Sequence, residues 1–215
     1  MEKYINLAVA KGRLADTAVK ALGGMGISFD DYTSSSRKLI HIDHKSGVRL
    51  VLVKADDVPT YVEQGAADVG IVGKDTLMES MASVYEMMDL EFGKCKFVVA
   101  ALKDRVENKQ KKSYVATKYV NVAKEFFKSK GKSVEIIKLN GSVELAPLVG
   151  LADTIVDIVE TGTTLKENGL VIVEEICPVS ARLIVNKASL KTKGDIIENM
   201  IQQLCPNQKE RKTDL

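Results

Sequence analysis

Short apolar runs rich in β-branched residues alternate with helical patterns along most of this 215-residue chain. Strands are expected at residues 4–9, 48–53, 69–72, 96–102, 113–117, 134–137 and 154–159, and helices at 14–22, 58–64, from 75 onward, and at 120–130, 143–148 and 164–168. Nearly continuous apolar strands separated by helices are typical of parallel strands covered on both faces. The alternation therefore predicts an α/β fold.

The C-terminal part follows a different pattern. Residues 171–177 and 181–186 predict two strands separated by Pro178, and residues 190–204 predict one amphipathic helix. The polar tail from Cys205 onward is expected to fray. Composition alone marks no linker and no domain boundary.

Composition and charge exclude several classes of protein. With 45% hydrophobic and 28% charged residues, the chain is typical of a globular protein. The net charge of +2 gives no electrostatic reason to expect nucleic acid, and the basic run at residues 103–112 favours a solvated loop. The apolar runs are too short for a signal peptide or a membrane span. The three cysteines, Cys95, Cys177 and Cys205, are odd in number and far apart, which favours reduced thiols over a disulfide framework. We therefore expect a soluble cytoplasmic protein.

Several common functional motifs fail on inspection of the sequence. Residues 131–133 (GKS) have Phe126 where a P-loop needs glycine, and residues 73–75 (GKD) lack the hydroxyl that follows its lysine. The two histidines, His41 and His44, lie in an expected strand without a nearby cysteine, which favours a structural role over zinc binding. They also give no basis for a histidine-activated nucleophile.

The strongest functional signal lies at residues 153–165, DTIVDIVETGTTL. A hydrophobic strand is followed by a turn at Gly162 and then by a helix, so that backbone N–H groups and threonine hydroxyls face one point and favour phosphate. Asp157 and Glu160 stand where they can accept hydrogen bonds from ribose hydroxyls or contact Mg²⁺ through water. A threonine-capped helix after a buried strand is the structural alternative. The segment predicts a phosphoribosyl-binding loop, and therefore a phosphoribosyltransferase.

A second set of candidate residues is basic. At residues 8–14 another strand ends in a glycine turn before a helix, and Lys11 and Arg13 stand where cations oppose the positive end of the helix dipole. An anion bound there would explain both. Arg37 and Lys54 add positive charge, and residues 67–75 form a third, glycine-rich strand and turn. Ligands of open α/β sheets bind outside the carboxyl ends of the strands, where all these turns are expected.

Five ordered blocks of the sequence resemble the short form of ATP phosphoribosyltransferase, the family that opens histidine biosynthesis, over residues 4–204. The blocks are AKGRL (10–14), SRKL (36–39), DVPTYVEQGAADVGIVGKD (57–75), KLNGSVELAPLVGLADTIVDIVETGTTLKENGL (138–170) and SARLIVN (180–186). Two positions depart from the family pattern. Ala10 stands where proline is usual, and Lys54 stands where arginine is frequent, although its positive charge is kept.

The resemblance implies a fold like that of type II periplasmic binding proteins, with two α/β domains and a central interdomain cleft. The first domain would be residues 1–90 plus 180–215, and the second residues 91–179. In the implied reaction, N1 of the ATP adenine displaces pyrophosphate from 5-phosphoribosyl 1-pyrophosphate, and N1-(5-phosphoribosyl)-ATP forms. Because N1 attacks through a lone pair, the reaction needs alignment and charge neutralisation more than a general base.

The resemblance also assigns roles to residues. The cations Lys11, Arg13, Arg37 and Lys54 would act on the departing pyrophosphate. The substrate-binding residues would be Asp157, Glu160, Thr161, Gly162, Thr163, Thr164 and Leu165, with Gly12, Glu144 and Asp153 as further contributors. Mg²⁺ would be carried by the pyrophosphate, so no dedicated metal ligand is expected.

The family's long form carries a C-terminal regulatory domain that binds histidine, and this chain ends without one. The resemblance therefore implies a homodimer of catalytic chains and a separate regulatory subunit, similar to histidyl-tRNA synthetase, in a hetero-octamer. The alternative function is a non-catalytic solute-binding module on the same fold. The lack of a signal peptide, a lipobox or a DNA-binding helix-turn-helix argues against that alternative.

Overall fold

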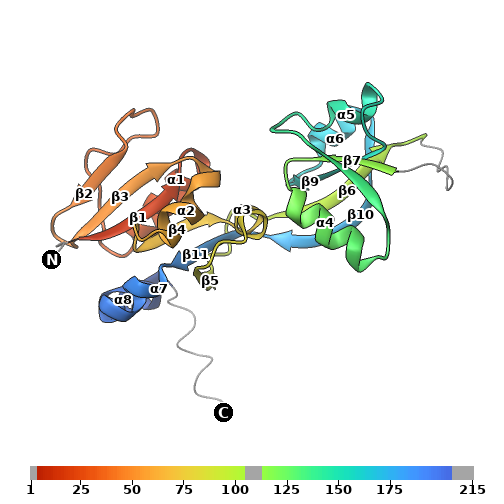
Figure 1. Cartoon of the computed structure of the whole chain (residues 1–215). Coiled ribbons are helices and arrows are strands. Elements are labelled where there is room, and N and C mark those ends of the chain that lie inside the picture. Colours follow the sequence, from red (N-terminus) through yellow and green to blue (C-terminus); the bar gives the residue numbers. More distant parts are fainter. Residues whose placement is uncertain (1–3, 105–112, 205–215) are drawn as a thin grey trace, which may run out of the picture. The chain divides into compact units, whose positions relative to one another are not determined.

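The computed structural model describes residues 4–104 and 113–204 (Figure 1). These residues form two compact units, each with its own sheet. Unit 1 contains the described residues up to Leu77, Met81–Gly93 and those from Ala181 onward, and unit 2 contains Met78–Ser80 and the described part of Lys94–Ser180. The tail from Cys205 and most of the basic run at 103–112 lie outside the described residues. No helix among those described is long and apolar enough to cross a membrane.

The described residues of unit 1 form a six-stranded sheet in the order β2-β3-β1-β4-β11-β5 (Figure 1). The strands are β1 (Ile5–Ala10), β2 (Ile40–Asp43), β3 (Val48–Val53), β4 (Val69–Gly73), β5 (Tyr85–Asp89) and β11 (Ala181–Val185). The helices that begin in this unit are α1 (Arg13–Gly23), α2 (Val58–Glu63), α3 (Lys74–Ser80), α7 (Lys187–Thr192) and α8 (Gly194–Leu204), and a short 3-10 turn, η1 (Ala55–Asp57), precedes α2.

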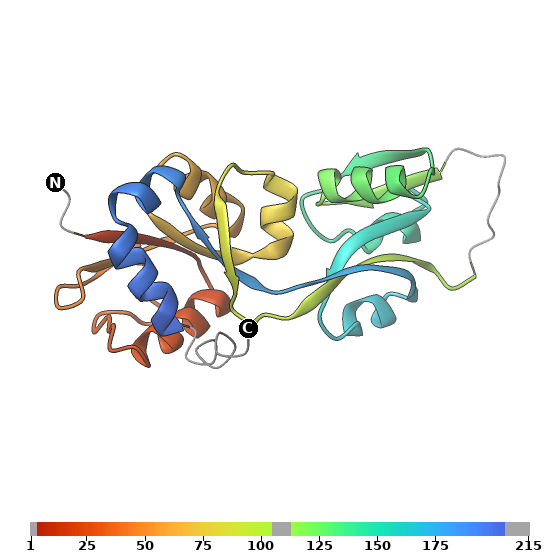
Figure 2. The same ribbon diagram turned by 90° about the horizontal axis from the view of Figure 1, so that it is seen from below.

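Strand β1 is the centre of unit 1 and is buried along its whole length. It pairs in parallel with β3 on one side and with β4 on the other. Its side chains alternate between the two faces: Leu7 and Val9 pack with α1 and α8, and Ala8 and Ala10 pack with α2 and α3. Figure 2 shows α1 and α8 together on one side of this sheet. Because both faces are covered, β1 is apolar at every position except Asn6.

The described residues of unit 2 form a five-stranded sheet in the order β10-β6-β9-β7-β8. The strands are β6 (Cys95–Leu102), β7 (Ser113–Thr117), β8 (Val134–Lys138), β9 (Thr154–Val159) and β10 (Leu170–Val179), and the helices are α4 (Val120–Ser129), α5 (Leu145–Leu148) and α6 (Thr163–Glu167). Phe127 of α4 packs on one face of the sheet, and Ala146 of α5 and Leu165 of α6 pack on the other. Strand β9 therefore lies in the middle of a covered sheet.

The predicted α/β class is confirmed, but the expectation of parallel strands holds for only part of each sheet. Strand β1 is parallel to β3 and β4, and β7 is parallel to β8 and β9. The remaining pairs are antiparallel, namely β2 with β3, β11 with β4 and β5, and β6 with β9 and β10. A tight turn at Gly47 joins β2 to β3, and a connection that short permits only antiparallel pairing. Strand β5 was not predicted, because its sequence YEMMD lacks an apolar run.

Two expectations about the C-terminal part are wrong. Pro178 does not separate two strands, because β10 continues through it to Val179. Strand β10 lies at the edge of its sheet, and edge strands tolerate proline since one of their sides makes no ladder bonds. The single helix expected at 190–204 is two helices. The Asn186 side chain caps α7 by accepting bonds from the N–H groups that follow it, and Lys193, with φ −131°, separates α7 from α8.

Gly70 of β4 is a point of close packing between the sheet of unit 1 and α2. A Cβ atom there would lie 2.7 Å from Val62, 3.0 Å from Ile184 and 3.1 Å from Val58. We expect Gly70→Ala to lower the free energy of unfolding by about 1–3 kcal/mol, because the added methyl group overpacks the core. Gly23→Ala is the control, since its Cβ would meet nothing within 4 Å and α1 should gain slightly from alanine. Urea-unfolding midpoints measure both variants, and an unchanged midpoint for Gly70→Ala would contradict this packing.

Candidate functional site

The turn between β9 and α6, here called the β9–α6 loop (residues 160–162), lines a cavity of about 180 Å³ in unit 2. The cavity is lined by most of the substrate-binding residues expected from the sequence: Glu144, Asp157, Glu160, Thr161, Gly162, Thr163, Thr164 and Leu165. The structure thus brings Glu144, the residue before α5, together with the segment that carried the strongest functional signal.

The geometry of the loop follows from its residues. Gly162 precedes α6 with φ 80° and ψ 2°, a left-handed conformation that glycine adopts without steric cost. Thr161 Oγ1 lies 3.0 Å from Thr163 Oγ1 and accepts a long hydrogen bond, 3.4 Å, from the Thr163 N–H group. The buried Leu165 side chain fixes the start of α6 in the core of unit 2. The turn is therefore held in place while its hydroxyl groups remain exposed.

Backbone N–H groups at the start of α6 are available to an anion. The Lys166 N–H group donates to the Gly162 carbonyl at 3.1 Å, which is the first bond of the helix. The N–H groups of Thr164 and Leu165 precede that bond and have no acceptor within the helix. Groups in this position attract phosphate through hydrogen bonding and through the helix dipole.

Two carboxylates flank the same cavity. Asp157, on β9, is half-buried, and one of its oxygens accepts a hydrogen bond of 2.8 Å from the Ile158 N–H group. Glu160, directly after the strand, is exposed. Carboxylate oxygens beside a phosphate position can accept hydrogen bonds from sugar hydroxyls or contact a hard cation through water. Among the described residues, no group of three or more His, Cys, Asp or Glu side chains is arranged to hold a metal ion.

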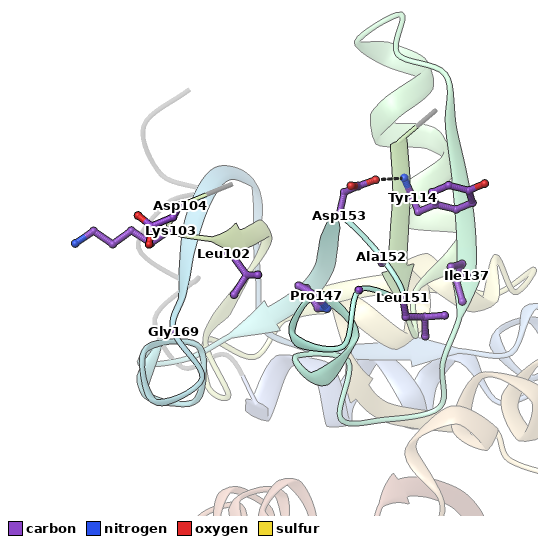
Figure 3. A pocket seen from close by; sticks show the side chains of 11 residues that line it. Leu102, Lys103, Asp104, Tyr114, Ile137, Pro147, Leu151, Ala152, Asp153 and Gly169 are labelled. Carbon is purple, nitrogen blue, oxygen red and sulfur yellow. Dashed lines mark hydrogen bonds between the residues drawn. The ribbon is translucent and has the colours of Figure 1, made fainter. Parts of the chain in front are cut away.

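The structure does not place Asp153 with these residues. Asp153 precedes β9, at the end opposite Glu160, and the six-residue strand between them spans roughly 20 Å. Its carboxylate accepts a hydrogen bond of 2.7 Å from the Tyr114 N–H group, and its own N–H group donates to the Tyr114 carbonyl at 2.9 Å (Figure 3). It lines a separate hollow of about 760 Å³ with Pro147 and Leu151. These bonds give Asp153 a structural role in joining β9 to β7.

In unit 1, two of the predicted cations follow neighbouring strands. Lys11 comes directly after β1, and Lys54 comes directly after β3. The two strands are parallel and in register, with Ala10 opposite Val53, and the Lys11 N–H group donates to the Val53 carbonyl at 2.9 Å. Both lysines are exposed and leave the sheet at the same edge. Parallel pairing of β1 and β3 therefore brings the two charges together.

Gly12 and Arg13 belong to the same edge. Gly12 has φ 96° and ψ −150°, a conformation that strains other residues, and it turns the chain from β1 directly into α1. Arg13, the first residue of α1, is exposed. Gly73, the last residue of β4, lies at this edge too, because β4 is parallel to β1 on its other side. The carboxyl ends of the parallel strands β1, β3 and β4 thus converge at one edge.

Arg37 approaches this edge from a different direction. It lies three residues before β2, whose first residue, Ile40, pairs with Val51 of β3. The pairing extends by one residue, since the Leu52 N–H group donates to the Leu39 carbonyl at 2.8 Å. Because β2 is antiparallel to β3, the residues before β2 lie toward the carboxyl end of β3. Arg37 is exposed there, on the side of the sheet edge that carries Lys54.

Asp31, which was not among the predicted site residues, holds the segment that carries Arg37. Its carboxylate forms an ion pair with Lys38 and lies 2.7 Å from Nδ1 of the buried His41. The hydrogen bond from Lys38, followed by that from His41, lowers the pKa of Asp31 to about 2. The contact agrees with the structural role expected for His41. No sequence motif marks Asp31, because its partners are seven and ten residues away.

Comparisons with known proteins agree on one family. The family model for ATP phosphoribosyltransferase (HisG) matches residues 54–205. ATP phosphoribosyltransferases of Thermoanaerobacter sp. (strain X514) and Alkaliphilus metalliredigens are each 56% identical to the chain. The alignments cover 93% and 94% of this chain and 94% and 96% of those proteins, respectively.

The chain is also similar to two solved proteins. A chain of the ATP phosphoribosyl transferase (HisG:HisZ) complex from Thermotoga maritima is 36% identical, with a TM-score of 0.82, over 93% of this chain and 96% of that chain. The VFT2 domain of Bordetella pertussis BvgS, described as periplasmic, has a TM-score of 0.60 at 10% identity, over 96% of this chain and 88% of that chain. The second likeness concerns the fold alone, and it confirms the expected similarity to periplasmic binding proteins.

The lowered pKa of Asp31 predicts an acid-dependent contribution to stability. A carboxyl group whose pKa falls from 3.8 to about 2 on folding stabilises the fold fully above about pH 4, and this contribution is lost as the pH falls toward 2. We expect Asp31→Asn to lower the urea-unfolding midpoint at about pH 5 and to differ progressively less from the parent chain between about pH 4 and pH 3. Asp30→Asn, at the exposed neighbouring position, is the control. A difference that does not shrink in acid would contradict this assignment.

Proposed function

The chain belongs to the ATP phosphoribosyltransferase family, and we propose that the two sets of residues described above perform its reaction. The chain joins ATP to 5-phosphoribosyl 1-pyrophosphate, giving N1-(5-phosphoribosyl)-ATP and pyrophosphate, the first step of L-histidine biosynthesis. The observation that carries the assignment of residues is the cavity at the β9–α6 loop, where the predicted threonines, carboxylates and helix N-terminus meet. Units 1 and 2 act as the two domains expected at residues 1–90 plus 180–215 and at 91–179.

The β9–α6 loop binds the ribose 5-phosphate of 5-phosphoribosyl 1-pyrophosphate. The donors are the N–H groups of Thr164 and Leu165 and the hydroxyl groups of the threonines that line the cavity. Asp157 and Glu160 accept hydrogen bonds from the ribose hydroxyls. Gly162 lets the backbone approach the phosphate closely, because no side chain stands at that point of the turn.

Mg²⁺ accompanies the pyrophosphate group of the substrate. Asp157, Glu160 and Glu144 supply oxygen donors at the cavity, and oxygen is the donor that Mg²⁺ prefers, so this set of residues suits the ion. They would hold it through water, since Mg²⁺ usually keeps several water ligands in phosphate sites. When bound, the ion offsets the negative charge of the pyrophosphate.

The cations of unit 1 neutralise the pyrophosphate as it leaves. Lys11, Arg13, Arg37 and Lys54 are exposed, and Lys11 and Lys54 leave the sheet side by side. Cations that are already in place when charge develops stabilise a transition state without reorganisation. Adenine N1 attacks through its lone pair, so alignment and charge neutralisation are sufficient, and no residue has to accept a proton before the attack.

The chain acts with a separate regulatory subunit. The Thermotoga maritima relative is a HisG:HisZ complex, and this chain covers 96% of the matched chain of that complex. On this basis homodimers of the catalytic chain assemble with a subunit similar to histidyl-tRNA synthetase into a hetero-octamer. The cytoplasm is the proposed location, because ATP and the other substrates of biosynthesis are available there.

The reaction itself provides the first test. Incubation of the chain with ATP, 5-phosphoribosyl 1-pyrophosphate and Mg²⁺ should produce phosphoribosyl-ATP and release pyrophosphate. Ultraviolet absorbance measures the formation of phosphoribosyl-ATP. The assay is run with and without the regulatory subunit. Absence of turnover under both conditions would refute the function. Thermal stabilisation by amino acids, but not by 5-phosphoribosyl 1-pyrophosphate, would instead favour the solute-binding alternative.

The loop assignment has its own test. We expect Thr161→Ala combined with Thr164→Ala to weaken the affinity for 5-phosphoribosyl 1-pyrophosphate by about tenfold to a hundredfold, because two hydroxyl donors to a charged phosphate are lost. Circular dichroism and the melting temperature should stay close to those of the parent chain. Asp153→Asn, at the other end of β9, is the matched control and should leave the affinity unchanged. An affinity that the double threonine variant does not change would refute the assignment.

A further inference from the structure

The segment between α1 and β2 carries Arg37 but has no regular secondary structure from Ser28 to Leu39. Lys11 and Lys54 follow strands directly, so the sheet fixes their backbone. Arg37 has no such support from backbone hydrogen bonds of a helix or strand. A cation that must meet developing charge needs a supporting shell of contacts, because small displacements reduce its effect. The side chains around Arg37 should therefore include one that connects this segment to the sheet, here called the tether.

Asp31 connects this segment to the interior of the sheet. Its Oδ1 atom lies 2.7 Å from Nδ1 of His41, a residue of β2 that is fully buried and pairs with Leu50 of β3. The other ring nitrogen of His41, Nε2, is buried and has no hydrogen-bond partner among the described residues. Asp31 is thus the partner of Nδ1, and this contact connects the carboxylate to the interior of unit 1.

The same carboxylate reaches the residue beside Arg37. Its Oδ2 atom pairs with Nζ of Lys38, and the Lys38 N–H group donates to Ser36 Oγ at 3.1 Å. Lys38 and Asp31 have side chains 58% and 45% exposed, and exposed ion pairs alone hold a segment weakly. The contact with the buried His41 is what makes Asp31 an effective tether, because it fixes one end of the ion pair.

Tyr32 extends the tether to α1. Its ring packs edge-on against His41, with centroids 5.4 Å apart, and its hydroxyl group donates to Asp16 Oδ1 at 2.7 Å. Asp16 lies in the first turn of α1, which Arg13 opens. One group of contacts around His41 therefore reaches both the side chain of Lys38, next to Arg37, and the helix turn that carries Arg13.

We propose that Asp31 is a positioning residue for phosphoribosyl transfer, which holds Arg37 in place through Lys38 and the buried His41. The inference rests on the proposed role of Arg37 in neutralising the leaving pyrophosphate. Asp31 itself makes no contact with the substrates. Its effect on the reaction should consequently pass through Arg37 and disappear when the guanidinium group is absent.

A double-mutant cycle on the complete enzyme, with its regulatory subunit, tests this. We expect Arg37→Ala to lower kcat by about a hundredfold and Asp31→Asn to lower it by about tenfold, with the KM for ATP unchanged. In the Arg37→Ala background, Asp31→Asn should change kcat by less than about twofold. An equal loss in both backgrounds would show that Asp31 acts independently of Arg37, and it would overturn the proposal.

Further outcomes separate this inference from the proposed function. Absence of turnover by the parent enzyme would refute the proposed function and the inference together. A parent enzyme that turns over while Arg37→Ala keeps full kcat would overturn the inference and leave the reaction standing. Asp30→Asn, a charge change at the exposed neighbouring residue, should retain the parent kcat. The melting temperature of each variant should lie above the assay temperature, which confirms that the assays compare folded enzymes. The variant Asp31→Glu keeps the carboxylate and should recover part of the lost kcat.

Discussion

Parallel pairing of β1 with β3 is the interaction on which the basic part of the site depends. With Ala10 opposite Val53, the two strands end together, and the hydrogen bond from Lys11 to Val53 keeps them together for one more residue. A shift of the register by one residue would turn the alternate side chains of β1 from one covered face to the other. Since both faces are packed with helices, the core resists that shift. The placement of Lys11 and Lys54 is therefore a consequence of core packing.

Unit 2 has the same arrangement of strand and turn, but its turn carries neutral hydrogen-bond donors in place of cations. Strand β9 lies between β6 and β7, its buried residues pack on both faces, and the chain leaves the sheet at its carboxyl end into a short helix. There the polar groups are N–H donors and threonine hydroxyls, which suit a phosphate, whereas the turn of β1 carries cations, which suit a leaving pyrophosphate. Both turns depend on a glycine with positive φ, Gly162 and Gly12, because the chain passes from strand to helix within three residues or fewer.

The sequence was sufficient for elements whose residues carry a local signal. The predicted bounds of β3, β7 and β9 are correct because β-branched and other apolar residues dominate these strands. The β9–α6 loop was singled out because glycine and threonine mark its turn, and its residues line one cavity. Features that depend on pairing between distant segments were missed. These include the antiparallel strands, the edge strand β5, the bonding of Asp153 to Tyr114 and the contact between Asp31 and His41. Spacing along the chain contains no information about such partners.

The difference between Arg37 and the two lysines explains why a tether is needed at all. Electrostatic stabilisation of a leaving group depends on where the charges lie before the reaction, and a flexible cation must give up conformational freedom to act. Lys11 and Lys54 have this freedom restricted at the backbone by the sheet. Arg37 lies in an irregular segment, so side-chain contacts have to supply the restriction. A carboxylate bound to a buried histidine supplies it. The Asp31 carboxylate already forms an ion pair with Lys38 and a contact with His41, and it therefore opposes the cationic edge less than an unpaired carboxylate would.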